Sequence, residues 1–194
     1  METKKYTTVA IILHWLIAVL ILGQIAGGLY MSSLPGGSPE KFDLFQLHKS
    51  FGLSILFLSL LRLAWRLLHR PPPLPETMKG SEKVAARLSH IGFYGLMIGV
   101  PLIGWALASA SPFAASVPTY IFGVVPWPHL PFFEGIEDRA ALAQRIAEIH
   151  KFFALSILAL LVLHVGAALK HHFSDKDDVL SRMLPMLKSN AGRN

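Results

Sequence analysis

The stretch IHKFFALSILALLVLHVGAAL, residues 149–169, decides the fold class of this chain. It is long enough to cross a hydrocarbon core of about 30 Å as a single helix. It also carries two histidines, His150 and His164, fourteen residues apart. Fourteen residues of α-helix advance about 21 Å and return to within roughly 40° of the same face. One membrane helix therefore offers an imidazole at each of two levels.

Three further stretches have the same apolar character, at about 9–31, 47–68 and 88–108. Each is long enough to span a bilayer. The segment from about 109 to 148 is rich in proline and aromatic residues, and we expect it to be an outer loop at the membrane surface. With 194 residues, the chain has little room for a separate soluble domain. The sequence predicts one domain over 1–194, an all-α integral membrane four-helix bundle.

The positive charges predict the orientation of the helices. If the four crossings alternate, all but five of the 18 lysines and arginines fall on one side. The five on the outer side are Lys41, Lys49, Arg139, Arg145 and Lys151. By the positive-inside rule, both termini are cytoplasmic. Most of the net charge of +6 comes from the lysines and arginines on the cytoplasmic side, which form a basic collar there. The excess of positive charge therefore gives no reason to expect a nucleic-acid partner.

The first apolar run has a second interpretation, because Lys4 and Lys5 precede it as in a signal peptide. Cleavage would remove His14 and leave an odd number of crossings, so we favour a retained first helix. The chain contains no cysteine. This excludes disulfides, cysteine-ligated iron–sulfur clusters and covalent C-x-x-C-H haem attachment.

Histidines at membrane depth are the candidate functional residues, because an unpartnered imidazole is costly in lipid. His48 and His150 lie at the outer level and form a natural pair. At the inner level, spacing alone leaves the partner of His164 open between His14 and His90. A single histidine is as readily a hydrogen-bonded packing residue as a ligand; four at two matched heights favour ligands.

Haem is the metal group that this arrangement favours. A closed zinc site needs four ligands, and neither level has a cysteine or a membrane-embedded carboxylate to complete one. Two imidazoles per level match the two axial positions of a haem iron. The bundle is therefore expected to enclose two b-type haems, one near each surface. Ligation by two histidines leaves the iron no open position, which favours one-electron transfer.

The chain resembles the prokaryotic cytochrome b561 family of di-haem four-helix membrane proteins, which are related to hydrogenase cytochrome b subunits. The resemblance spans nearly the whole chain. Its motifs are Ile12–Trp15 (ILHW), Leu47–Leu53 (LHKSFGL) continuing to Leu60–Arg62 (LLR), Ser89-His90 through Pro101–Trp105 (PLIGW), and Leu163–Val165 (LHV) running to His171–Phe173 (HHF).

The resemblance implies a role for each of four histidines. His14 and His164 would hold the haem on the cytoplasmic side, and His48 and His150 the outer one. His90 would have no assigned role. Family members exchange electrons with ubiquinone in the bacterial inner membrane, and some resemble superoxide oxidases.

Four further residues are candidates at the cytoplasmic side. His171 lies two turns beyond His164, and Trp15 adjoins His14, so both are candidates for a quinone site. Arg62 and Arg66 are candidate partners of haem propionates, because a guanidinium matches a carboxylate. Membrane topology alone would also place aromatic and basic residues there.

The sequence thus predicts a cytochrome that passes single electrons across the inner membrane between a periplasmic donor and ubiquinone. Superoxide as donor would make it a superoxide:ubiquinone oxidoreductase, and the five outer cations would then steer this anion. One alternative is a membrane anchor subunit of a dehydrogenase or hydrogenase. Another is a histidine-relay transporter, which the lack of carboxylates within the spans disfavours.

Overall fold

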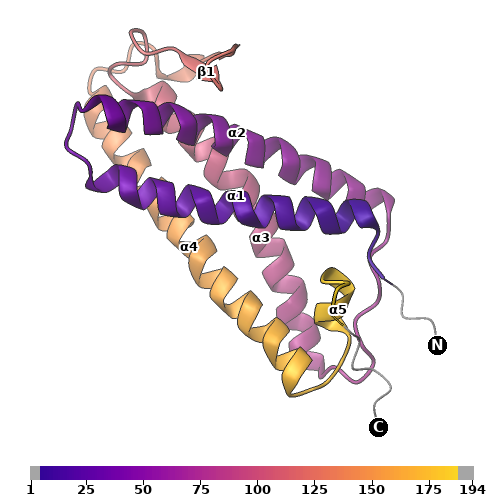
Figure 1. Cartoon of the computed structure of the whole chain (residues 1–194). Coiled ribbons are helices and arrows are strands. Elements are labelled where there is room, and N and C mark those ends of the chain that lie inside the picture. The colour runs from indigo at the N-terminus through magenta and orange to yellow at the C-terminus, as the bar shows by residue number, and fades with distance from the viewer. Residues whose placement is uncertain (1–4, 188–194) are drawn as a thin grey trace.

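The computed structural model describes residues 5–187, and its architecture is a bundle of four long helices (Figure 1). The helices are α1 (Thr8–Ser33), α2 (Pro39–Leu68), α3 (Gly80–Ala110) and α4 (Arg139–Phe173). Within the described part of the chain, these four are long and apolar enough to cross a membrane. The predicted fold class is confirmed. Lys4, Lys188 and Arg193, which contribute to the charge asymmetry, lie outside the described residues.

Each helix is longer than its apolar run, because polar caps extend it beyond the hydrocarbon. The Ser38 side chain caps α2 by accepting from the Lys41 N–H, and Pro39 occupies its first turn. Asp138 caps α4 by accepting from the Ala141 N–H. As a result, α2 starts eight residues before the expected span, and the expected outer loop of 109–148 is shortened to 111–138.

The outer loop carries structure that the sequence did not predict. Strands β1 (Thr119–Ile121) and β2 (Val125–Trp127) form an antiparallel hairpin, followed by the 3-10 turn η1 (Pro131–Phe133). The hairpin lies over the outer end of α2 (Figure 1). Ser50 on α2 fixes it there, because its Oγ accepts from the Phe122 N–H at 2.9 Å and lies 3.3 Å from the Tyr120 carbonyl.

A short fifth helix, α5 (Val179–Met183), closes the opposite end of the bundle. Arg182 pairs with Asp178 at 2.8 Å and also donates to the carbonyl of Pro73 in the link between α2 and α3. The Trp15 indole donates to the Met183 carbonyl at 2.8 Å. These contacts tie α5 to α1 and to the α2–α3 link.

The buried core is small and lies at mid-bundle. It consists of Ile17, Ile21, Ile55, Met97, Val100 and Ile157. Many other large apolar side chains face outward, including Val19, Val162 and Leu163, each about two-thirds exposed. Such a surface suits lipid rather than water. The core therefore separates two levels of the bundle, and the candidate site residues lie above and below it.

Candidate functional site

The outer pair of histidines is adjacent in space. His48 comes from α2 and His150 from α4, and their ring centroids are 6.1 Å apart with an interplanar angle of 73°. Both line a cavity of about 340 Å³ whose other walls are mainly apolar and aromatic. Volume and lining are those of a ligand-binding cavity.

A hydrogen bond sets the tautomer of one of the outer histidines. The His150 Nδ1 lies 3.1 Å from the Val100 carbonyl oxygen. A carbonyl only accepts, so Nδ1 carries the proton and Nε2 keeps its lone pair, which is the tautomer that a metal requires. The His48 Nδ1 is buried, and residues 5–187 offer it no hydrogen-bond partner. The Gln24 side chain donates to the His48 backbone carbonyl at 2.8 Å and links α1 to this site.

Two glycines make room for these imidazoles. A Cβ on Gly104 would lie 3.1 Å from Cε1 of His150, and one on Gly28 would lie 3.3 Å from Cε1 of His48. Both glycines also line the cavity. Glycine spacing in a sequence does not by itself separate helix contact from room for a ligand.

The inner level gathers three histidines. The His164 ring centroid is 6.2 Å from that of His14 on α1 and 6.3 Å from that of His90 on α3. Phe93 packs edge-on against His164 at 5.2 Å. These distances alone leave the choice between His14 and His90 open, as the sequence spacing did.

The ring separations fit two imidazoles on opposite sides of one metal ion. With metal–nitrogen bonds of about 2.0–2.1 Å and a ring centre roughly 1.1 Å beyond each nitrogen, the two ring centres would be about 6.3 Å apart. The separations at both levels agree with this value. The residues present therefore fit axial ligation of a haem iron.

Arg62 is close to the inner histidines, with its Nη2 3.3 Å from the His14 Nδ1. The guanidinium can only donate, so in this contact Nδ1 holds the lone pair. A histidine that binds iron through Nε2 has its proton on Nδ1, and we expect Arg62 to turn away when iron is bound. The Tyr94 ring lies 5.5 Å from the Arg62 guanidinium and 6.0 Å from that of Arg66. Both arginines are near enough to the inner level to serve as propionate partners.

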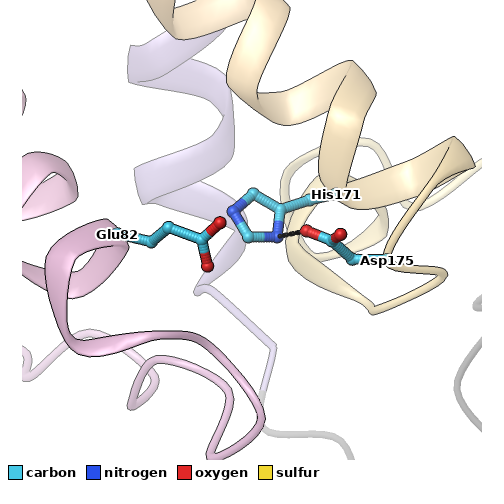
Figure 2. Close-up of side chains that lie close together, drawn as sticks. All are labelled: Glu82, His171 and Asp175. Atoms are coloured by element: carbon cyan, nitrogen blue, oxygen red, sulfur yellow. Dashed lines mark ion pairs between the residues drawn. The ribbon is translucent and has the colours of Figure 1, made fainter.

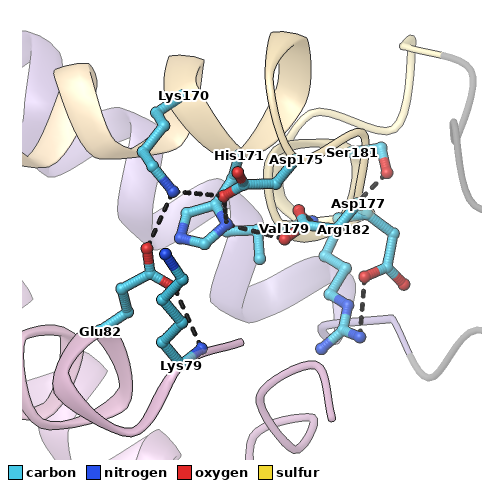
Figure 3. A network of polar contacts seen from close by, with 10 residues as sticks. Lys79, Glu82, Lys170, His171, Asp175, Asp177, Val179, Ser181 and Arg182 are labelled. Carbon is cyan, nitrogen blue, oxygen red and sulfur yellow. Dashed lines mark hydrogen bonds and ion pairs between the residues drawn. The ribbon is translucent and has the colours of Figure 1, made fainter. Parts of the chain in front are cut away.

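His171, a candidate for the quinone site, lies buried in a polar network at the end of α4 (Figure 3). Its Nδ1 is 2.7 Å from Asp177 and 3.1 Å from Asp175, and Figure 2 shows its other nitrogen turned toward Glu82. His171, Glu82 and Asp175 are close enough together to hold a metal ion. However, the Lys170 ammonium already contacts both carboxylates, at 2.8 and 2.6 Å, and disfavours a cation there.

Four of the five outer cations divide into two groups. Lys49 and Lys151 directly follow the paired histidines in sequence and line the same cavity. Lys49 donates to the Thr119 hydroxyl at 2.9 Å. Arg139 instead binds the Ser109 and Ala110 carbonyls at the end of α3, and Lys41 binds the Leu34 carbonyl. Arg139 and Lys41 are therefore bound to backbone carbonyls, while Lys151 and Lys49, the latter also bound to Thr119, line the cavity that contains the outer histidines.

Paired histidines at two depths of an apolar helical bundle define the class of a membrane haem protein. A family model described as prokaryotic cytochrome b561 matches residues 5–186. The chain belongs to this family of membrane electron-transfer proteins, and its cofactor is b-type haem.

Curated relatives agree with this assignment. The chain is 33% identical to cytochrome b561 homolog 2 of Escherichia coli (strain K12), over 97% of this chain and 96% of the relative. It is 30% identical to a protein of Yersinia pestis named probable superoxide oxidase CybB, over 94% of this chain and 97% of that protein. It is also 27% identical to cytochrome b561 homolog 1 of Escherichia coli, over 95% and 99%.

Proposed function

We propose that this protein moves single electrons across the bacterial inner membrane from a periplasmic donor to ubiquinone, using two haems b. His48 and His150 would hold the outer haem, and His14 and His164 the inner one. The observation that carries the proposal is the pair of ring separations, 6.1 and 6.2 Å, at two levels of one bundle. When bound, the haems supply reversible one-electron chemistry.

The protein's own residues would fix the ligands in place. The Val100 carbonyl holds the proton of His150 on Nδ1, which directs Nε2 into the cavity. Gly104 and Gly28 give the two imidazoles their space. Arg62 and Arg66 would balance the propionate charge at the inner level. The apolar lining limits access of water to the outer pair.

For the donor, we propose superoxide. Lys49 and Lys151 line the cavity that contains the outer histidines, and their charge would attract a small anion. One relative carries superoxide oxidase in its name. Two superoxide anions would each lose one electron and leave as dioxygen. Ubiquinone would take up both electrons with two protons, so the protein would be a superoxide:ubiquinone oxidoreductase.

For the acceptor, we propose that ubiquinone binds near His171 and Trp15, at the same end of the bundle as His14 and His164. Asp177 holds His171 through Nδ1. Its other nitrogen, Nε2, is turned toward Glu82 (Figure 2), so the quinone would hydrogen-bond to Nε2 in place of Glu82. Trp15 packs edge-on against His14, with ring centroids 5.2 Å apart, and would supply an aromatic face.

Histidine substitutions test the haem assignment. We expect His48→Ala or His150→Ala to remove one haem per chain and His14→Ala or His164→Ala to remove the other, measured by reduced-minus-oxidised spectra with haem quantitation. His90→Ala is the matched control at the inner level and should keep both haems. If His14→Ala keeps both haems and His90→Ala loses one, His90 is the inner ligand.

The donor and acceptor are tested on the purified two-haem protein. Superoxide should reduce the haems, and a soluble ubiquinone should reoxidise them. His171→Ala should slow reoxidation while leaving both haems and their reduction by superoxide unchanged. Haems that superoxide does not reduce would contradict the donor assignment, and unchanged reoxidation in His171→Ala would contradict the quinone site.

A further inference from the structure

A second cavity, about 50 Å³ in volume, opens where α2 ends, at the end of the bundle that carries α5 (Figure 1). Its walls come from the start of α1, the end of α2, the α2–α3 link and Met183. The cationic or imidazole side chains among its lining residues are Lys5, Arg62, Arg66, His69 and Arg70. Among the described residues that line it there is no carboxylate.

This concentration of positive charge has no protein counter-ion in the described part of the chain. The ion pairs there join Glu82, Asp175, Asp177 and Asp178 to Lys170, His171 and Arg182. Arg66 instead faces the Tyr94 ring at 6.0 Å. Cations gathered in a concave site of this kind repel one another and create a strong positive potential, which favours a bound anion.

The depth of the cavity indicates the kind of anion. Trp65 donates to the Thr7 hydroxyl at 2.9 Å and stacks on His69 with ring centroids 3.8 Å apart, an aromatic arrangement typical of the headgroup level. Next to them, Leu67 and Leu68 are more than three-quarters exposed and present apolar surface to acyl chains. The cavity is large enough for a phosphate group, whose oxygens match guanidinium donors.

We propose that this cavity binds the phosphate of an anionic phospholipid. Arg62 and Arg66 are the candidate propionate partners, so the remaining lysine and arginine of the cavity, Lys5 and Arg70, would hold the phosphate. Each cation near a membrane surface strengthens such binding several-fold. The same side chains would also accept free inorganic phosphate. Comparing the affinities for lipid and for inorganic phosphate distinguishes the two ligands.

The test uses the full chain with its haems, purified in detergent. Native mass spectrometry measures the affinity for dioctanoyl phosphatidylglycerol, for dioctanoyl phosphatidylcholine and for inorganic phosphate. The variant is Lys5→Gln with Arg70→Gln, which leaves both candidate propionate arginines intact. Arg87→Gln is the matched control, because Arg87 is an exposed arginine on α3, is expected on the same membrane side and does not line the cavity.

We expect one phosphatidylglycerol site, with phosphatidylcholine bound at least about 10-fold more weakly. The double variant should lose about 30-fold in affinity for phosphatidylglycerol, while Arg87→Gln keeps wild-type affinity. Haem content should not change in either variant. If the double variant loses haem, Arg70→Gln alone carries the test with an expected loss of about 5-fold.

Three results would overturn the proposal. Equal affinity for the two lipids would mean that the site does not recognise the anionic headgroup. Equal losses in the double variant and in Arg87→Gln would mean that the whole positive collar attracts lipid without a site. Displacement of phosphatidylglycerol by an equal concentration of inorganic phosphate would assign the cavity to soluble phosphate.

Discussion

A single methyl group at Gly104 would compete with an imidazole for space. We expect Gly104→Ala to push His150 out of position, because the new Cβ would lie 3.1 Å from its Cε1. Overpacking of this kind costs about 1–3 kcal/mol, so the outer haem should be released roughly 10-fold more readily. The measurement is the rate of haem loss to an excess of apomyoglobin.

Gly99→Ala is the matched control, since Gly99 lies on the same helix and a Cβ there meets nothing within 4 Å. That variant should keep its haems and gain a little helix stability. Equal haem loss in the two variants would mean that crowding at His150 is not the cause.

Arg62 places a positive charge close to the inner level, and it stays near that level as a propionate partner after it turns from His14. Replacing it with glutamine should lower the midpoint potential of the inner haem, because a nearby cation disfavours the oxidised, more positive iron. The expected shift is roughly 50 mV, the effect of about 1 kcal/mol on a one-electron couple. Spectroelectrochemical titration measures it. Arg87→Gln should leave both potentials unchanged, and a shift of the outer haem alone would contradict the placement of Arg62.

At the scale of elements, the outer hairpin depends on α2 through Ser50, which is 1% exposed. Ser50→Ala should leave the Phe122 N–H without its partner and loosen the hairpin by about 1–3 kcal/mol. Hydrogen exchange should then speed up in β1 and β2 while α2 stays protected. Ser54→Ala is the control, because the Ser54 hydroxyl donates to the Ser50 carbonyl of its own helix and not to the hairpin, as far as the described residues show. Equal exchange in both variants would contradict the role of Ser50.

The helices show what could be predicted from this sequence. The apolar runs predicted four membrane-spanning helices, and the described chain has four helices that are long and apolar enough to cross a membrane. The hairpin was missed because three-residue strands are too short to show an alternating pattern. Helix α5 was missed because five residues have no helical periodicity to detect. Both depend on contacts distant in sequence, such as Ser50 with Phe122 and Trp15 with Met183.

The sequence predicted the depth of each site histidine along the bundle, but not the direction in which each histidine faces around its helix. Rise per residue places His14, His90 and His164 at one level, but the azimuth of each helix depends on packing. The structure brings all three together, with similar separations from His164. The assignment of ligands therefore stays a prediction, and so do the quinone and propionate residues. The need for glycine at positions 28 and 104 could not be predicted from the sequence, because it depends on how closely the neighbouring helices approach.

For the whole molecule, the two predicted ligand pairs connect different helices. His48 and His150 join α2 to α4, and His14 and His164 join α1 to α4. Both of these helix pairs pack on one another far less than α1 packs on α2 or α3 on α4. An inner haem would therefore supply a connection that side-chain packing provides only weakly, while the core around Ile17 and Ile157 keeps the two levels apart.

The distribution of charge over the whole molecule predicts its orientation. The end with α5 carries the basic collar, so it should face the cytoplasm, with the hairpin outside.

Because the chain has no cysteine, a single reporter thiol is unambiguous. In spheroplasts, Ser116→Cys in the outer loop should react with a membrane-impermeant maleimide. Ser174→Cys, at the end of α4, should react only after the membrane is opened; both serines are exposed, so burial does not explain a difference. The opposite labelling pattern would reverse the orientation and place the Lys49 and Lys151 cavity in the cytoplasm.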